Sequence, residues 1–145
     1  MKRHDSLVPL SRFHKSVLFL ALMSKKNSPP IKDYPTTLKE KKNYALSFHE
    51  HELEAHFRFE EEKLLPSIRG KNEELDELAD EIVREHLELR KFFKILRNGN
   101  NPETELNNLG VALEKHIRKE ERKLFQKIQA SLTPQELNQL ILMYE

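Results

Sequence analysis

The sequence contains no cysteine and only three glycines among its 145 residues. The absence of cysteine excludes disulfide bonds and thiolate metal sites, so any bound metal must take nitrogen and oxygen ligands. The scarcity of glycine, together with long stretches rich in Leu, Glu, Lys and Arg, favours helices, because these side chains lose little rotamer freedom in a helix. The composition therefore predicts an all-α protein.

The chain also lacks an excess of charge, with 25 basic and 24 acidic side chains. This balance gives no overall field that would attract nucleic acid or an acidic membrane surface, and we expect neither partner. No run of about 18 apolar residues occurs, which argues against a membrane-spanning helix. The apolar run from Val17 to Met23 is short for a signal peptide. We assign it to a helix of the domain and expect a cytoplasmic protein.

Residues that break or cap helices divide the chain into four long amphipathic segments. A length of 145 residues suits one domain with a single core, and we treat 1–145 as one domain. The predicted helices span about residues 6–24, 37–65, 72–98 and 102–130, and a short helix begins at Thr133-Pro134. Four helices with mostly short connections predict an antiparallel up-down-up-down four-helix bundle with a short C-terminal helix.

Two stretches of the chain are similar to each other. HFRFEEEKLLPSI at 56–68 and HIRKEERKLFQKI at 116–128 share seven of thirteen positions, and each begins with His followed four residues later by Glu. At about 100° per residue, these pairs lie on the apolar faces of their helices, as do single histidines of the first and third helices. The polar residues predicted to point inward are His14, His56, Glu60, His86, His116 and Glu120.

The convergence of six such residues is more informative than either pair. Seven His and, by count, twenty Glu in 145 residues give about one His-xxx-Glu pair by chance. A single inward histidine is more often a hydrogen-bonded core residue than a ligand. Six polar groups in one core would lack other partners, however, and burying a carboxylate costs several kcal/mol unless it is paired or binds a cation.

A metal centre would satisfy all six residues together. Two His and one Glu for each of two metal ions use the whole set, and paired carboxylates can also bridge the ions. Iron is the first choice and manganese the second, because imidazole and carboxylate suit both metals. Zinc fits less well, since its structural sites favour four ligands.

Two further polar residues precede His56 on its helix. Glu52, one turn before His56, is an additional ligand or an acceptor for an imidazole N–H, with a simple surface position as the alternative. His49 lies two turns before His56, about 10 Å away, and we expect an inward, hydrogen-bonded histidine there. The run EEEK at 60–63 is predicted to be mostly a solvated face beyond its first residue.

Taken together, PLSRFHKSVLFL, HFRFEEEKLLP, EHLELRKFF and HIRKEERKLF resemble the motifs of the hemerythrin-like (HHE) family of non-haem di-iron four-helix bundles. The resemblance covers the chain from about Leu7 to Gln129. It implies two iron ions, joined by an Fe–O–Fe or a carboxylate bridge, with the two glutamates bridging. The implied iron ligands are His14, His56, Glu60, His86, His116 and Glu120.

The chain departs from the oxygen-carrying members of that family. Those members have two histidines four residues apart on the third helix, where this chain has Ile82 or Arg90 at the positions that could complete the pair. On the fourth helix they have His followed five residues later by Asp, whereas here Glu120 follows His116 by four. The two His-xxx-Glu pairs look more like relatives implicated in iron and oxygen sensing or in repair of nitrosative damage.

The resemblance therefore implies a protein that binds or senses a diatomic ligand, O2 or NO, or that handles iron. One alternative is a di-iron redox enzyme or iron donor acting on NO, peroxide or damaged iron centres. A second alternative is a metal-free helical interaction module whose histidines are core polar groups. The sequence decides neither whether the protein is an enzyme nor which protein it binds.

Overall fold

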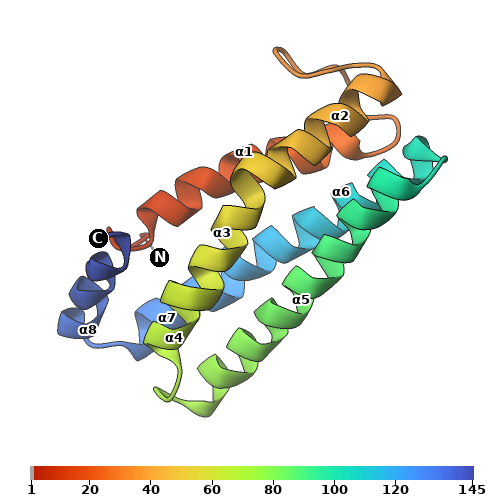
Figure 1. The fold of residues 1–145 in the computed structure, drawn as a ribbon. Helices are drawn as coiled ribbons and strands as arrows, with labels where there is room; N and C mark the ends of the chain where they lie inside the picture. The colour runs from red at the N-terminus through yellow and green to blue at the C-terminus, as the bar shows by residue number, and fades with distance from the viewer. Residues whose placement is uncertain (1) are drawn as a thin grey trace.

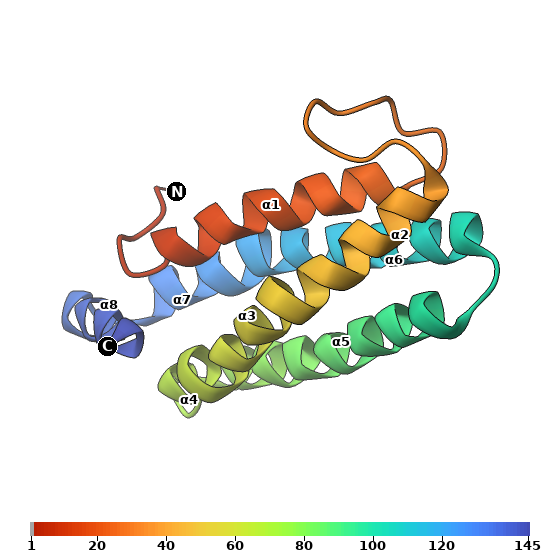
Figure 2. The same cartoon turned by 45° about the horizontal axis from the view of Figure 1, so that its top comes forward.

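A computed structural model describes residues 2–145, which form helices and no strand. Four long helical stretches lie alongside one another, and the two ends of the chain lie at the same end of the molecule (Figures 1 and 2). The stretches are α1 (Val8–Ser24); α2 (Leu38–Phe48), α3 (Glu54–Phe59) and α4 (Leu65–Ile68) in one run; α5 (Glu73–Asn98); and α6 (Pro102–Lys119) with α7 (Phe125–Ser131). The short helices α8 (Pro134–Gln139) and η4 (Leu140–Tyr144) follow. The prediction of an all-α fold is confirmed.

Side-chain caps fix where several of these helices begin. The side chains of Thr37, Asn72 and Asn101 accept hydrogen bonds from backbone N–H groups of the first turns of α2, α5 and α6. The second stretch ends at Ile68, slightly beyond Leu65, as predicted. Pro66 does not stop it, because this proline lies in the first turn of α4, where a helix tolerates a missing N–H.

Three π-helical turns, which the sequence did not predict, interrupt the helices. They are η1 (His49–Leu53), η2 (Glu60–Leu64) and η3 (Glu120–Leu124). In the last two, the N–H that follows the turn bonds to the carbonyl of the first glutamate, five residues back. These two turns begin at equivalent positions of the repeated stretch. Because π turns are rare and are frequent at functional sites, they mark both glutamates as positions of interest.

The buried apolar side chains form two clusters at the two ends of the helical stretches. On α1, Leu10 belongs to one cluster and Val17 to the other, with the buried His14 between them. On α5, Ile82 and Leu89 belong to the two clusters in the same way. The core is therefore divided by a band of polar side chains near the middle of the molecule.

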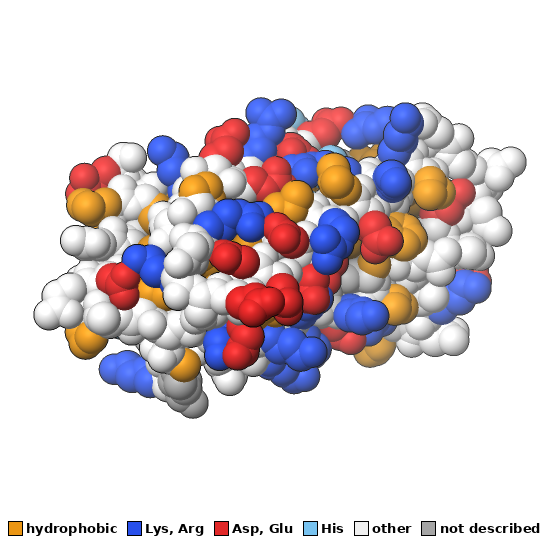
Figure 3. Space-filling model, turned by 90° about the horizontal axis from the view of Figure 1, so that it is seen from below, with side chains coloured by type: hydrophobic (Ala, Val, Ile, Leu, Met, Phe, Trp, Pro, Cys, Tyr) orange, Lys and Arg blue, Asp and Glu red, His pale blue; other side chains and the backbone are white. Residues whose placement is uncertain are grey.

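The surface carries charges of both signs. On the face shown in Figure 3, acidic side chains gather near the middle, with basic side chains around them. This mixture agrees with the nearly equal numbers of basic and acidic residues in the sequence. Within the range 2–145, no helix has the length and apolar character needed to cross a membrane.

Candidate metal centre

The polar band consists of the six residues that the sequence placed on inward faces. Each is at most 8% exposed, and both glutamates are fully buried. They are also the only buried ionisable side chains in the part of the chain that the structure describes. The six are His14 on α1, His56 on α3, Glu60 at the start of η2, His86 on α5, His116 on α6 and Glu120 at the start of η3.

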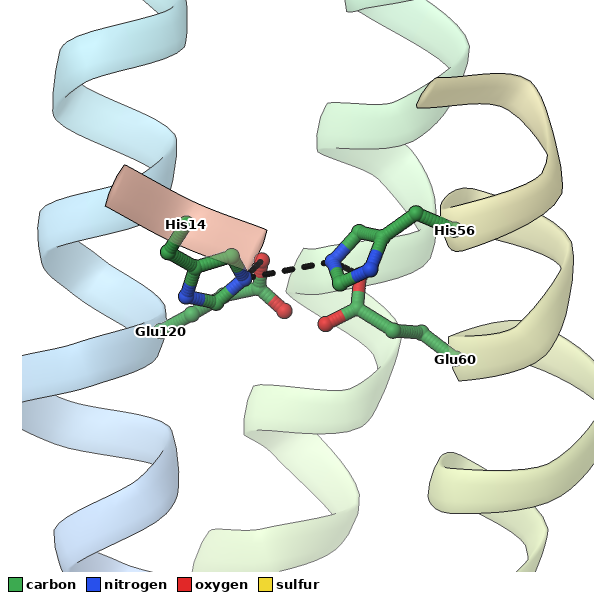
Figure 4. A group of neighbouring side chains, drawn as sticks. All are labelled: His14, His56, Glu60 and Glu120. Atoms are coloured by element: carbon green, nitrogen blue, oxygen red, sulfur yellow. Dashed lines mark hydrogen bonds and ion pairs between the residues drawn. The ribbon is translucent and has the colours of Figure 1, made fainter. Parts of the chain in front are cut away.

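The first half of the cluster lies between α1 and α3. The Nε2 atoms of His14 and His56 face each other at 3.2 Å, with Glu60 and Glu120 beside them (Figure 4). Nε2 of His56 is 3.5 Å from Oε1 of Glu60, and Nε2 of His14 is 3.6 Å from Oε1 of Glu120. Two imidazole nitrogens and two carboxylates thus point at one small volume.

The second half lies between α5 and α6 and uses the same two glutamates. Nε2 of His86 is 3.1 Å from Oε1 of Glu60, and Nε2 of His116 is 3.0 Å from Oε1 of Glu120. In each half, one nitrogen or oxygen atom from each of the four residues lies within 4.8 Å of the others. The arrangement is therefore two histidine pairs that share one pair of carboxylates.

The outer nitrogens of three of these histidines are held by carboxylates of a second layer. Because an ionised carboxylate only accepts hydrogen bonds, each imidazole must donate through Nδ1, which turns Nε2 into the cluster. The three bonds are His14 Nδ1 to Glu121 at 2.6 Å, His86 Nδ1 to Glu61 at 2.6 Å and His116 Nδ1 to Glu85 at 2.7 Å. Within residues 2–145, Nδ1 of His56 has no such partner.

These second-layer carboxylates were not predicted from the sequence. The prediction of a mostly solvated face beyond Glu60 holds for Glu62 and Lys63 but not for Glu61, which is partly buried and bonds to His86. A signal was present, because Glu61 and Glu121 are the second glutamate of the Glu-Glu pair that both copies of the repeat keep. Glu85 had no comparable signal beyond standing next to His86.

The structure does not bring Glu52 to the cluster. Its side chain is exposed, and in the described part of the chain it forms no hydrogen bond or ion pair with any of the six residues. His49, in contrast, is partly buried, bonds to Glu54 at 3.1 Å and stacks on Phe93 with ring centroids 4.3 Å apart. The expectation of an inward, hydrogen-bonded histidine at 49 is therefore confirmed.

The two shared carboxylates have opposite pKa shifts. Burial raises the pKa of Glu120, and the neighbouring Glu60 carboxylate raises it further. Burial also opposes ionisation of Glu60, but His56 and hydrogen bonds within the cluster outweigh it and hold the pKa of Glu60 well below its usual value. Burial disfavours a charged His116 as well, yet the Glu120 carboxylate raises its pKa to about 10. Without a metal, the cluster therefore holds protons on imidazole.

Several atoms of the cluster have no hydrogen-bond partner among the described residues. These buried atoms are Oε2 of Glu60, both carboxylate oxygens of Glu120 and Nε2 of His116, although Nε2 of His116 and Oε1 of Glu120 lie 3.0 Å apart as an ion pair without hydrogen-bond geometry. An unpartnered buried polar atom costs about 1–3 kcal/mol, so a native core rarely keeps several together. A cation in each half would provide partners for all of them. The nitrogen and oxygen donors fit iron or manganese, and the residues present therefore fit a metal centre.

Comparison with known proteins agrees with this chemistry. The family model of the hemerythrin HHE cation-binding domain matches residues 15–128 of the chain. The match includes five of the six clustered residues and begins one residue after His14. Neither the curated proteins nor the solved structures provide a match. The family model covers well over half of the sequence, and the chain belongs to the hemerythrin HHE cation-binding domain family.

Proposed function

We propose that the protein binds two iron ions in the polar band of its core. The observation that carries this proposal is that two groups of four potential ligands share both of their carboxylates. Shared carboxylates can bridge two cations and lower the repulsion between them. The proposed ligands are His14 and His56 for one ion, His86 and His116 for the other, and Glu60 and Glu120 for both.

The proposed centre belongs to one domain with an up-down-up-down antiparallel arrangement of the four helical stretches. In support, α1 packs on α6, α5 packs on α6, and α2 contacts α1, α5 and α6. All four stretches contribute to the polar band, so no part of the chain could form the centre alone. The helices α8 and η4 form the short C-terminal addition.

Bound iron would supply open coordination positions for a diatomic ligand, because each ion receives only four protein ligands. The protein's own part is to fix the imidazole rings through the second-layer carboxylates and to surround the centre with apolar clusters that limit access of water. We therefore propose that the protein binds or senses O2 or NO, or handles iron. We also propose that it acts in the cytoplasm, without a nucleic-acid or membrane partner.

A di-iron redox enzyme or iron donor acting on NO, peroxide or damaged iron centres is the second candidate. A cavity of about 120 Å³ between α5 and α6 favours it, because His116 and its hydrogen-bond partner Glu85 line this cavity. A small substrate in the cavity would lie beside the centre. The metal-free module is less well supported, since it leaves the unpartnered oxygens of Glu60 and Glu120 without an explanation.

Metal analysis of untagged protein reconstituted with iron without air tests the proposal. We expect two iron ions per chain, and a clear loss of iron in His56→Ala and in Glu120→Ala. His51→Ala is the matched control, because His51 lies on the same stretch with an exposed side chain. Less than one bound ion of either iron or manganese in the unaltered protein would refute the proposal, as would unchanged content in both variants.

Absorption spectra of the reduced, iron-loaded protein then separate the two candidates. A stable band that appears with O2 or NO and disappears when the gas is removed supports ligand binding. Continuous consumption of NO or peroxide, without a stable band, supports the enzyme.

A further inference from the structure

An arginine lies behind a second-layer carboxylate in each half of the cluster. Arg90 on α5 contacts both oxygens of Glu61, at 3.1 and 3.3 Å. Arg3, in the segment before α1, contacts Glu121 at 3.2 Å. We propose that Arg3 and Arg90 are positioning residues that each hold one metal-binding histidine in place, an inference that rests on the proposed metal centre.

Arg90 contacts two of the groups that surround the ring of His86. Its guanidinium lies over the ring of Phe57, 5.4 Å from the centroid. Phe57 in turn stacks on His86, with centroids 4.2 Å apart and planes at 23°. Glu61 holds the Nδ1 edge of the same imidazole at 2.6 Å. One arginine thus supports the hydrogen bond at the edge of His86 and the aromatic ring against its face.

Arg3 is placed in the same way around His14. Its guanidinium lies 5.3 Å from the centroid of Phe125, and Phe125 stacks on His14 with centroids 5.5 Å apart and planes at 10°. Glu121 bonds to Nδ1 of His14 at 2.6 Å. Each half of the centre therefore contains the same two sets of contacts. In one, an arginine contacts a carboxylate that bonds to the imidazole; in the other, the same arginine lies over a phenyl ring that stacks on the imidazole.

The repeated sequence explains the equivalent positions of Glu61 and Glu121 but not the rest of this likeness. Phe57 comes one residue after His56, whereas Phe125 comes five residues after Glu120, and Ile117 takes the place of Phe57 in the second copy. The arginines come from α5 in one case and from the segment before α1 in the other. Two different parts of the sequence thus produce one arrangement, which points to a shared requirement of the two imidazoles.

Simple ion pairing between elements accounts for only part of these contacts. Arg90 also bonds to Glu54 at 2.9 Å, and that pair joins α5 to α3 without touching any of the four clustered imidazoles. Partly exposed pairs of this kind contribute little to stability. The contacts of Arg90 with Glu61 and Phe57 act instead on the ring of His86. Without the arginine, the Glu61 carboxylate is free to turn toward solvent, and His86 loses the acceptor that fixes its ring.

The two positioning residues differ in how they are themselves held. Arg90 is part of the long helix α5, while Arg3 depends on contacts of the segment before α1. That segment is held through Gln129, which accepts from the His4 N–H at 3.0 Å and donates to the Lys2 carbonyl at 2.8 Å. Arg3 also lies outside residues 15–128, which the family model matches. The His14 half therefore depends on residues that this family match does not cover.

Titration of the metal-free protein with Co²⁺ tests this inference without any measurement of activity. We expect the unaltered protein to bind two ions. Arg90→Gln should weaken the ion at His86 and His116 by about tenfold, the low end of the range for partners of metal-binding histidines. Arg3→Gln should weaken the ion at His14 and His56 by a similar factor. Anomalous scattering from crystals grown at limiting Co²⁺ identifies which position loses occupancy.

Matched variants separate positioning from loss of charge. Arg97→Gln on α5 removes an exposed arginine that pairs with Glu50, and Lys2→Gln removes a charge next to Arg3. Both should bind two ions as the unaltered protein does. Arg90→Lys keeps the charge but not the planar fork, so it should restore only part of the affinity.

The outcomes distinguish this inference from the proposed function. Two ions with unchanged affinity in Arg3→Gln and Arg90→Gln would overturn the positioning roles and leave the metal centre intact. Equal weakening at both positions, together with a lower melting temperature of the metal-free variant, would show a general structural role and would also overturn them. An unaltered protein that binds no ion would overturn the proposed function itself.

Discussion

Raising the pH should increase the affinity for metal and lower the free energy of unfolding of the metal-free protein. In the metal-free state burial opposes the charge on His116, but the Glu120 carboxylate 3.0 Å away prevails and raises the pKa of this histidine from 6.5 to about 10. A metal ion needs the lone pair on Nε2, so binding must displace that proton. Between about pH 6 and 8, this competition changes the affinity by about a hundredfold, or about 3 kcal/mol.

The same shift determines how stability depends on pH. The pKa of His116 in the folded, metal-free protein lies above its ordinary value of 6.5. The protonated His116 therefore contributes its full stabilisation of the folded protein below pH 6.5. The contribution is lost as the pH rises toward about 10, and its size is up to about 5 kcal/mol. The metal-loaded protein lacks this loss, since its His116 is already neutral. The stability gained from metal should therefore grow with pH.

Calorimetric titration with Co²⁺ in buffers of different ionisation enthalpy measures both the affinity and the protons released. We expect release of about one proton from His116 at neutral pH, and further release from His56, whose pKa the nearby Glu60 carboxylate raises against the effect of burial. Urea denaturation of the metal-free protein follows the stability. An affinity that is constant from about pH 6 to 8 and a binding reaction without proton release would refute the reasoning.

Two further predictions concern single substitutions. Glu61→Gln should weaken metal binding by about 10- to 100-fold, because a glutamine amide holds the Nδ1–H of His86 less well than an ionised carboxylate does. The exposed Glu62→Gln is the control and should have no effect in the same Co²⁺ titration. Equal affinities of the two variants would contradict the proposed role of Glu61. Gly110→Ala should lower the unfolding free energy by about 1–3 kcal/mol in urea denaturation, because a Cβ there would lie 2.6 Å from the Ala21 carbonyl oxygen on α1. The neighbouring, exposed Val111→Ala is its control, and a Gly110→Ala protein as stable as the unaltered one would show that α1 and α6 separate easily.

Periodicity was sufficient to predict the polar band. Each of the six clustered residues lies on the apolar stripe of its own helix, and a stripe can be read from one helix alone. The breaks between helices were predictable for a similar reason, because caps such as Thr37 and Asn72 act within a few residues. The π turns were not predictable in this way, since nothing in the local sequence of 60–64 distinguishes an α turn from a π turn.

The second-layer carboxylates show the limit of an inward-or-outward classification. Glu61 and Glu121 follow an inward glutamate, so their side chains leave the helix about 100° away, toward a neighbouring helix rather than toward solvent. Whether such a residue is solvated depends on which helix lies there and on what that helix presents at the same height. Here the neighbour presents the outer nitrogen of His86 in one case and of His14 in the other.

The positions of the two glutamates explain the similarity between residues 56–68 and 116–128. In both copies, one glutamate of the Glu-Glu pair enters the centre and the next reaches a histidine on an adjacent helix. The π turn that begins at the first glutamate is widened by one residue, and the leucine at its end, Leu64 or Leu124, is again fully buried. His-xxx-Glu-Glu therefore supplies three groups to two layers of the site: an imidazole, a shared carboxylate and an outer carboxylate. The outer carboxylate accepts from Nδ1 of its histidine and so turns Nε2 toward the shared carboxylates, which is the orientation that a metal ligand needs.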